Sequence, residues 1–480
     1  MATVVAAQVR AGEQVLKETE GLSRTHDRVP AQYVALPDGS AVFRRFEADG
    51  EIIDTDLGPH APFYRRIFAL DEQIKARYGD GDGPTKGGPG LPSRQRAGLV
   101  MLEITEKCNL TCPMCYAGSN PAGRHYSLAE IEQRIDQIIA AEGPTVCIQL
   151  SGGEPSVRKD LPEIAALIRS RGFTNFEMIS NGVRIARDAD FAQSLKEWGF
   201  TSVYLQWDSL RESDIELLRG EKLLDVRMKA LAKLEEAGLP CVLAVALLPG
   251  LNTDQIGGIL ELARQHSIVC AVSLQAATPF GNRWEVGEGE KPDTRGFGRK
   301  LRMPDIQELV AEQVQIPTET FLPLGFGSPL CQAFAVIRND KRAGRWVPAA
   351  PDLTWEAYAN ILGEDPVEFM RVVTKGKKAV IKRWVTQGGF SVVKTLWKYI
   401  GKNPQNFLDT HYTTIFIKPF MDAEDLDFDR IDRCTYHNAS PRGLHSFCAL
   451  NNLVRPTTTV DASAFEGAIP LPAPELIMAD

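Results

Sequence analysis

Residues 98–275 alternate between short apolar runs and longer amphipathic stretches, and this alternation constrains the fold more than any other feature of the chain. The six short runs are rich in β-branched residues and are typical of strands, whereas the stretches between them have helical spacing. Strands separated by helices pair in parallel through right-handed crossovers. The predicted fold class is α/β with a partial (β/α)6 barrel, although the pattern leaves a closed eight-unit barrel open. In either case, ligands are expected at the C-terminal ends of the strands.

Composition changes divide the chain into three parts. Residues 78–93 are rich in Gly and Pro, which interrupt both helix and sheet, and this segment is predicted to be a linker. Before it, two strand-like runs flank the Asp38-Gly39 turn and indicate a small β-rich module. After about residue 300 the alternation stops. We therefore predict an N-terminal β-rich module with its linker over residues 1–93, a core over 94–300 and a C-terminal domain over 301–480.

The overall composition narrows the classes of function. The 480 residues are 44% hydrophobic and 24% charged, and the net charge of −8 gives no general reason to bind nucleic acid. No apolar run approaches 18 residues, and the N-terminus lacks the pattern of a signal peptide, so the expectation is a cytoplasmic protein without a membrane span. The 9 cysteines do not suggest a disulfide scaffold and favour metal or catalytic roles for any cluster.

Three cysteines lie close together directly after the first predicted strand, in "TEKCNLTCPMCYAGS". Cys108, Cys112 and Cys115 have C-x₃-C-x₂-C spacing, and a chance origin is improbable at this cysteine content. A structural zinc site would need a fourth ligand, for which His125 is the nearest candidate, and buried free thiols are a further alternative. Three thiolates can instead hold three irons of a [4Fe–4S] cubane, which leaves the fourth iron able to bind another ligand.

This loop resembles that of the radical S-adenosylmethionine (SAM) superfamily, in which the same motif follows the first strand of a partial barrel. The resemblance implies that Cys108, Cys112 and Cys115 hold a [4Fe–4S] cluster whose open iron chelates SAM. It also implies reductive cleavage of SAM to a 5′-deoxyadenosyl radical in a dry cavity, with electrons from a donor such as flavodoxin or ferredoxin.

Three later segments match the superfamily in order, each at the end of a predicted strand. They are "LSGGEP", "ISNG" and "LQWDSL" on the second, third and fourth strands. The superfamily often has an aromatic residue before the third cysteine; this chain has Met114 there, and Tyr116 is the candidate for contact with adenine. The SAM-binding residues implied by the resemblance are Tyr116, Gly152, Gly153, Glu154, Pro155, Ser180, Asn181, Gln206 and Asp208.

The six remaining cysteines fall into two groups. Cys147, Cys241 and Cys270 lie in strand-like runs, where a free cysteine behaves as a small buried hydrophobe. Cys331, Cys434 and Cys448 lie in irregular segments that suit metal-binding loops, although three unrelated thiols are the alternative.

The segments around the second group, "FLPLGFGSPLC", "FIKPFMDAEDLDFDRIDRC" and "FCALNN", resemble the branch of the superfamily that contains archaeal tetraether lipid synthase and the dihydropterin methylase. That branch carries an auxiliary iron–sulfur cluster, so a second [4Fe–4S] cluster on Cys331, Cys434 and Cys448 is implied, with its fourth position open to substrate, His437 or water. The alternative interpretation of His437 is a packed surface histidine. The N-terminal module is similar to a metal-binding knuckle of the branch with every cysteine lost, and no metal is expected there.

A basic segment from Arg371 to Lys402 interleaves Lys and Arg with aromatic residues and contains no acid. It is either an amphipathic helix pair with a solvated charged face or a surface that contacts an anionic membrane, lipid or phosphate. Peripheral membrane contact is therefore one of its two interpretations.

The resemblance implies a transferase that forms a C–C bond, by coupling or methylation, at an unactivated carbon of a lipid-like or pterin-like small molecule. A peptide-modifying radical SAM maturase and a non-catalytic iron–sulfur protein are the alternatives. The fold alone does not specify the product.

Overall fold

The computed structural model describes residues 10–78, 97–278, 299–324, 327–340, 343–349, 355, 411–441 and 443–455. The basic segment of residues 371–402 and most of the expected linker lie outside these ranges. Within them, no helix is long and apolar enough to cross a membrane.

The alternating core forms the six predicted parallel strands, in chain order across one sheet. The strands are β5 (Leu99–Thr105), β6 (Cys147–Gly152), β7 (Phe176–Ser180), β8 (Ser202–Gln206), β9 (Cys241–Leu247) and β10 (Val269–Ala276). The helices of the crossovers are α2 (Leu128–Glu142), α3 (Leu161–Ser170), α4 (Val183–Arg187), α5 (Phe191–Trp198), α6 (Glu212–Arg219), α7 (Leu224–Ala237) and α8 (Ile256–Gln265). Helix α2 begins at the capping box of Ser127 and Glu130, in which each side chain bonds the other residue's backbone N–H. The prediction of an α/β fold with a parallel sheet is confirmed.

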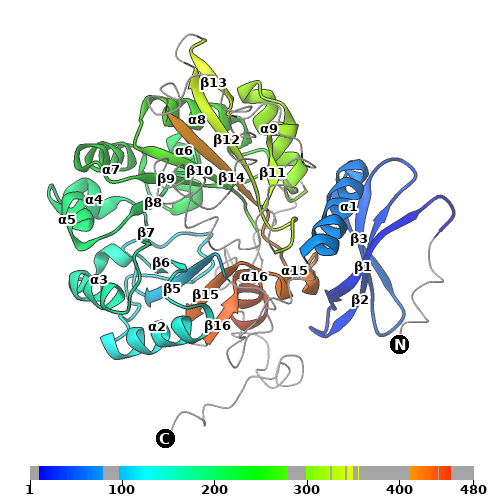
Figure 1. Ribbon diagram of the computed structural model, residues 1–480, viewed down its shortest axis with the longest axis horizontal. Coiled ribbons are helices and arrows are strands. Elements are labelled where there is room, and N and C mark those ends of the chain that lie inside the picture. Colours follow the sequence, from blue (N-terminus) through cyan, green and yellow to red (C-terminus); the bar gives the residue numbers. More distant parts are fainter. Residues whose placement is uncertain are drawn as a thin grey trace, which may run out of the picture.

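Strands from the C-terminal part extend both edges of this sheet. Strand β14 (Tyr412–Lys418) pairs in parallel with β10, and β15 (Tyr436–Ser440) pairs in parallel with β5. Beyond them lie antiparallel strands: β12 (Ala333–Asp340) beside β14, with β11 (Leu322–Pro323) and β13 (Arg345–Pro348) on β12, and β16 (Gly443–Ser446) beside β15. Figure 1 shows β14 and β15 on opposite sides of the core. The sheet therefore has eight consecutive parallel strands, two more than the alternation indicates.

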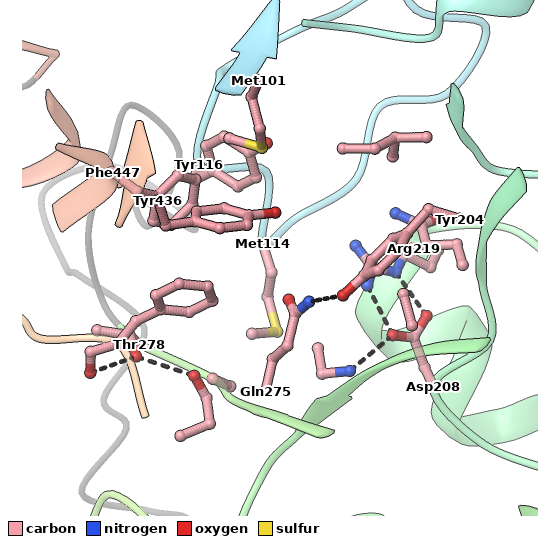
Figure 2. A pocket seen from close by; sticks show the side chains of 17 residues that line it. Met101, Met114, Tyr116, Tyr204, Asp208, Arg219, Gln275, Thr278, Tyr436 and Phe447 are labelled. Atoms are coloured by element: carbon pink, nitrogen blue, oxygen red, sulfur yellow. Dashed lines mark hydrogen bonds and ion pairs between the residues drawn. The ribbon is translucent and has the colours of Figure 1, made fainter. Parts of the chain in front are cut away.

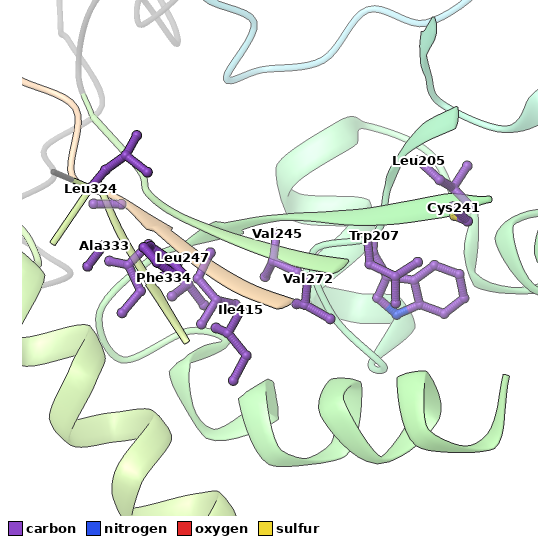
Figure 3. Close-up of a cluster of buried hydrophobic side chains, with 14 of the residues drawn as sticks. Leu205, Trp207, Cys241, Val245, Leu247, Val272, Leu324, Ala333, Phe334 and Ile415 are labelled. Atoms are coloured by element: carbon purple, nitrogen blue, oxygen red, sulfur yellow. The ribbon is translucent and has the colours of Figure 1, made fainter. Parts of the chain in front are cut away.

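The main hydrophobic core lies between the sheet and its covering helices. Alternate residues of neighbouring strands, such as Val245, Val272 and Ile415, point toward the helices and are fully buried, as Figure 3 shows. The opposite set of alternate residues points into the concave face of the sheet. That face carries polar side chains such as Gln149, Glu177 and Gln275.

The N-terminal module is an antiparallel sheet of β1 (Gln14–Leu22), β2 (Arg28–Ala35), β3 (Ala41–Phe46) and β4 (Ile52–Gly58), followed by α1 (Ala61–Tyr78). The predicted turn at Asp38-Gly39 joins β2 to β3, and Gly39 has a φ of 87° that favours glycine. The module packs against α15 (Phe428–Asp432), where the Tyr33 hydroxyl donates to Asp427 at 3.0 Å. Figure 1 shows it to one side of the barrel.

The other elements connect these parts. Helix α9 (Met303–Val314) packs near α8, and α16 (Phe447–Ala449) leads into a π-helical turn, η6 (Leu450–Val454). Short 3₁₀ turns are η2 (Pro155–Val157), η3 (Thr253–Gln255) and η5 (Thr318–Thr320).

Candidate active site

The loop after β5 carries the three clustered cysteines. The Cys112 side chain is buried, and Cys108 and Cys115 are half-buried. The loop winds tightly, since the Cys115 N–H donates to the Cys112 carbonyl at 3.3 Å and the Leu110 N–H donates to the Cys108 Sγ at 3.4 Å. Apolar side chains of α4 and α6, with Leu223, pack against these cysteines. The predicted loop therefore lies at the C-terminal end of the first core strand, as expected.

The glycines of the GGEP segment hold the base of this loop. The Gly153 N–H donates to the Thr105 carbonyl at 2.7 Å, and the Glu154 N–H donates to the Lys107 carbonyl at 3.0 Å. A Cβ atom on Gly152 would lie 2.1 Å from the Thr105 oxygen, and one on Gly153 would lie 2.2 Å from the Lys107 oxygen. Neither position leaves room for a side chain, because the cysteine loop passes directly over the strand end.

Glu154 links the GGEP segment to the end of β7. Its buried carboxylate accepts hydrogen bonds from the Ser180 hydroxyl at 2.9 Å and from the Asn181 N–H at 2.7 Å. Burial raises the pKa of Glu154 even though these hydrogen bonds favour the charged form. The Asn181 amide then donates to the Asn109 side chain of the cysteine loop at 2.7 Å. Glu154, Ser180 and Asn181 therefore fix the loop relative to two strands, and the buried Pro155 opens the turn η2 that follows.

A cavity of about 150 Å³ opens beside the loop, at the C-terminal ends of the strands (Figure 2). Its wall is largely apolar and aromatic. The lining residues are Met101, Met114, Tyr116, Ile179, Tyr204, Gln206, Asp208, Arg219, Ala244, Ala246, Gln275, Ala276, Ala277, Thr278, Phe420, Tyr436 and Phe447. Of the residues expected to bind SAM, Tyr116, Gln206 and Asp208 line this cavity. The GGEP residues and the Ser180-Asn181 pair lie behind the loop and support it.

Asp208 forms a buried ion-pair cluster with two arginines at the cavity wall. Arg219 of α6 contacts its two carboxylate oxygens at 2.8 and 2.7 Å, and Arg227 of α7 approaches at 3.1 Å. Burial opposes ionisation of Asp208, but the two guanidinium groups outweigh it and lower its pKa. Asp208 has a φ of 64°, an uncommon value for a non-glycine residue. The arginines were missed by sequence reasoning, because a basic residue on an amphipathic helix carries no local signal of burial.

Arg219 also connects the cavity to the cysteine loop. Burial raises the pKa of the Cys112 thiol, and Arg219 partly offsets the rise by charge and by hydrogen bonding. Burial raises the pKa of Cys108 to about 12, with a further contribution from Glu154. These thiols therefore hold their protons until a cation displaces them, as metal ligands do.

The donor set fits an iron–sulfur cluster. Three sulfurs from one loop in an apolar surrounding match the ligands that such clusters take. His125, the candidate fourth zinc ligand, lies 2.8 Å from the Thr105 hydroxyl through its Nδ1. No three His, Cys, Asp or Glu side chains in the described ranges are arranged around a single metal ion. The sulfurs of a cubane need no such common centre, because each binds a different iron.

The fold brings Cys331, Cys434 and Cys448 into one region. Burial raises the pKa of Cys434, and the charges of Cys331 and Cys448 raise it further. Burial likewise raises the pKa of Cys448 to about 12. The buried Arg430 of α15 lies within reach of Cys331 and Cys448, and its Nη2 donates to the carbonyls of Leu330 and Pro419 at 3.2 and 3.0 Å.

His437 does not join these cysteines. It is buried on the face of β15 that packs against α2, where its Nδ1 lies 3.2 Å from the Glu142 carboxylate. The neighbouring Tyr436 points to the opposite face and lines the cavity, as alternation along a strand requires. The interpretation of His437 as a packed histidine therefore fits the structure, although it packs in the interior and not at the surface.

The three strand cysteines differ in exposure. Cys241 is buried and Cys147 is half-buried, whereas Cys270 is exposed near the start of β10. The expectation of three buried thiols is therefore wrong for Cys270.

Aromatic side chains lie between the two cysteine groups. Tyr116, next to Cys115, contacts Phe447, next to Cys448, with ring centroids 5.4 Å apart. Phe420 and Tyr436 pack on the same Phe447 ring at 4.6 and 5.7 Å. This aromatic cluster forms one side of the cavity, opposite the Asp208–Arg219 pair in Figure 2.

Comparison with known proteins gives four findings. Residues 102–263 match the model of the Radical SAM superfamily. A 7,8-dihydro-6-hydroxymethylpterin dimethyltransferase of Methanocaldococcus jannaschii is 27% identical over 403 residues, which cover 74% of this chain and 77% of that protein. A mitochondrial GTP 3′,8-cyclase of Arabidopsis thaliana is 33% identical over 194 residues, which cover 39% of this chain and 48% of that protein. Among solved structures, Streptococcus suis SuiB bound to S-adenosylmethionine matches 61% of this chain and 69% of its own, at 12% identity and a TM-score of 0.36.

Proposed function

Because residues 102–263 form a radical SAM domain, we propose that this radical SAM enzyme forms a C–C bond at an unactivated carbon of a pterin-like or lipid-like substrate. Coupling and methylation are the two reactions considered, and the name of the methanogen relative favours methylation of a pterin-like ring. The observation that carries the proposal is the position of Cys108, Cys112 and Cys115. Their loop meets a largely apolar cavity, lined in part by aromatic residues, at the C-terminal ends of the parallel strands.

Cys108, Cys112 and Cys115 would hold a [4Fe–4S] cluster. When bound with SAM and reduced, it supplies the 5′-deoxyadenosyl radical that removes hydrogen from carbon. Tyr116, Gln206 and Asp208 would contact SAM from the cavity wall. Gly152, Gly153, Glu154, Pro155, Ser180 and Asn181 would act mainly by fixing the loop, because their hydrogen bonds run to the loop and to neighbouring strands. The electron donor would be a flavodoxin or a ferredoxin.

The cavity wall suits a reaction that water would quench. Tyr116, Phe420, Tyr436 and Phe447 present aromatic surface on one side, and Asp208 is fully buried against Arg219 on the other. Excluding water protects a reactive intermediate and strengthens every charge interaction inside the cavity. Substrate would be bound with its reacting carbon facing the cysteine loop.

We also propose an auxiliary [4Fe–4S] cluster on Cys331, Cys434 and Cys448. Support comes from their proximity, since the charges of Cys331 and Cys448 raise the pKa of Cys434, and from the buried Arg430 beside them, whose positive charge would offset that of the thiolates. His437 is not proposed as a fourth ligand, because Glu142 holds its Nδ1 on the other face of β15.

The test is anaerobic reconstitution followed by iron and sulfide counting and a reductant-dependent assay for 5′-deoxyadenosine. We expect about eight irons in the wild type. A Cys331→Ala, Cys434→Ala, Cys448→Ala variant should keep about four irons and some cleavage of SAM. A Cys108→Ala, Cys112→Ala, Cys115→Ala variant should lose all cleavage.

The exposed Cys270 provides the matched control, and Cys270→Ala should change neither the iron content nor the cleavage of SAM. Four irons in both the wild type and the C-terminal variant would remove the auxiliary cluster. A wild type that makes no 5′-deoxyadenosine with any reductant or candidate substrate would remove the enzymatic function.

A further inference from the structure

Lys418 ends β14 on the cavity face of the sheet. It is paired in register with Gln275 of β10, and Gln275 lines the cavity. Residues paired across parallel strands point to the same face, so Lys418 points toward the concave side of the barrel. Two residues later, Phe420 also lines the cavity. Lys418 therefore lies at the C-terminal end of a parallel strand, where barrels of this kind bind ligands.

The Lys418 ammonium lies between two tyrosine rings of the cavity wall. Its Nζ is 4.4 Å from the centroid of the Tyr436 ring and 5.4 Å from that of the Tyr204 ring. The residue is only 7% exposed. Cation–π contact with two rings stabilises the charge in part, but it supplies no hydrogen-bond acceptor.

The Lys418 ammonium forms no hydrogen bond or ion pair with a side chain or carbonyl of the described ranges, and the backbone carbonyl of Lys418 accepts from the Phe420 N–H at 3.2 Å. The titratable groups that face it are Glu177 and Cys147, together with the two tyrosines. The Glu177 carboxylate already accepts hydrogen bonds from Gln149 and Ser202, both at 2.6 Å. Burial lowers the pKa of Lys418 to about 8, and Glu177 offsets this fall only partly. A buried ammonium without an acceptor is costly, which is typical of a group kept for a ligand.

The other polar groups at this side of the cavity already have partners. The Tyr436 hydroxyl donates to Gln149 at 2.8 Å, and the Gln275 amide donates to the Tyr204 hydroxyl at 2.6 Å. Arg219, a second cation in the wall, is paired with Asp208. A ligand in the cavity would therefore lie against Tyr204 and Tyr436, with the positive charge of Lys418 next to these two rings.

We propose that Lys418 binds an oxyanion of the substrate, a phosphate, a carboxylate or an ionised ring oxygen, and so orients the substrate in the cavity. This inference rests on the proposed function in one respect, since it takes the cavity to be the substrate site. It adds the chemical class of the substrate: a molecule with an anionic oxygen next to a part that packs on tyrosine and phenylalanine rings. Lys418 is thus a binding residue that no local sequence motif marks.

The first test locates an anion directly. Anaerobic crystals of the reconstituted protein are soaked in bromide, whose anomalous scattering identifies each bound ion. We expect bromide beside the Lys418 Nζ in the wild type and in Lys418→Arg, and none there in Lys418→Met, which keeps the length of the side chain without its charge. A direct Lys418–Glu177 ion pair with no bromide at the Nζ would overturn the proposal.

The second test distinguishes the source of the oxyanion. Binding of glycerol phosphate, as a lipid headgroup probe, and of 7,8-dihydro-6-hydroxymethylpterin is measured by calorimetry on unreduced holoenzyme. For the tighter of the two probes, we expect Lys418→Met to weaken binding about 10- to 100-fold and Lys418→Arg to restore most of it, because charge-assisted hydrogen bonds are strong. Equal affinity in wild type and Lys418→Met would contradict an anion subsite.

These outcomes are separable from those of the proposed function. Lys233→Met serves as a surface control and should bind both probes as the wild type does, since Lys233 pairs with Glu236 on the outer side of α7. Bromide at Lys418 in a protein that never yields 5′-deoxyadenosine would retain the anion subsite and remove the enzyme assignment. Normal cleavage of SAM without any bromide at Lys418 would retain the enzyme assignment and remove the anion subsite.

Discussion

The two groups of three cysteines are built in opposite ways. Cys108, Cys112 and Cys115 lie on one short loop, and local backbone hydrogen bonds already bring them together. Cys331 precedes Cys434 and Cys448 by more than a hundred residues, and only the completed fold brings the three close. A site encoded on one loop can be recognised from spacing and should survive distant damage. A site assembled from several segments should fail whenever the packing around it fails.

The largest expected effect is that of Asp208→Asn. This change leaves Arg219 and Arg227 buried without their carboxylate, and breaking such a cluster costs about 3–5 kcal/mol. We expect this loss in the free energy of unfolding, measured by urea denaturation, together with weaker iron retention at the 108–115 loop. The exposed Asp225, which pairs with Lys229, is the control, and Asp225→Asn should cost no more than about 0.5 kcal/mol. Equal effects of the two variants would show that the Asp208 cluster is not needed.

Gly153→Ala should come next. Its Cβ would meet the Lys107 carbonyl at 2.2 Å, so the cysteine loop must move, at a cost of about 3 kcal/mol. We expect the loop to lose its iron while the C-terminal group keeps about four irons. Gly143→Ala is the control for backbone strain without a steric contact: nothing lies within 4 Å of its Cβ, and its φ of 76° with a ψ of 173° adds strain of about 1–3 kcal/mol. Full iron content in Gly153→Ala would mean that the loop tolerates displacement.

Arg430→Met tests the assembled site. It removes the donor to the Leu330 and Pro419 carbonyls and should cost about 2 kcal/mol. The expected pattern is the reverse of that for Gly153→Ala: iron falls from about eight to about four, and cleavage of SAM persists in part. Arg338→Met, which removes an exposed arginine, should change neither readout. Loss of iron from both cysteine groups in Arg430→Met would argue against their independence.

The smallest effect is expected at Glu13, in the N-terminal module. Hydrogen bonding to Arg44 lowers the pKa of Glu13 from 4.5 to about 2. Glu13 therefore stabilises the folded state above about pH 4.5, and this contribution is lost as the pH falls toward 2. Glu13→Gln should cost about 1.5 kcal/mol at pH 7 and progressively less below pH 4.5, measured by hydrogen exchange of β1 to β4. A loss of stability that is independent of pH would show that the charge of Glu13 contributes nothing to stability. The iron content of Glu13→Gln is expected to be the same as that of the wild type.

The contrast between a site on one loop and a site assembled from several segments also explains which features could be predicted from the sequence. The six core strands and the match of residues 102–263 to the radical SAM superfamily follow from local patterns, and both are confirmed. The positions of β14 and β15 were not predicted, because no local pattern says that late strands will pair with β10 and β5.

At the site, sequence spacing identified the cysteine loop, but not Arg219 or Lys418. A single basic residue in an amphipathic stretch has the same appearance whether it is solvated or buried, and only tertiary packing distinguishes the two. The GGEP glycines are intermediate between predicted and missed features. The motif was recognised, yet its close contact with the carbonyls of Thr105 and Lys107 could be seen only in the structure.

The placement of β14 and β15 at the two edges of the core has a consequence for biosynthesis. Strand β5 acquires its outer neighbour only after roughly 330 further residues have been made, which takes roughly 20 to 70 seconds at common translation rates. Until then, both edges of the nascent six-stranded sheet expose unpaired backbone groups, and such edges promote association between chains. Pairing across so long a separation is also slow. We therefore expect the yield of soluble protein to depend on chaperones and on low temperature during expression, and removal of β15 to increase aggregation sharply.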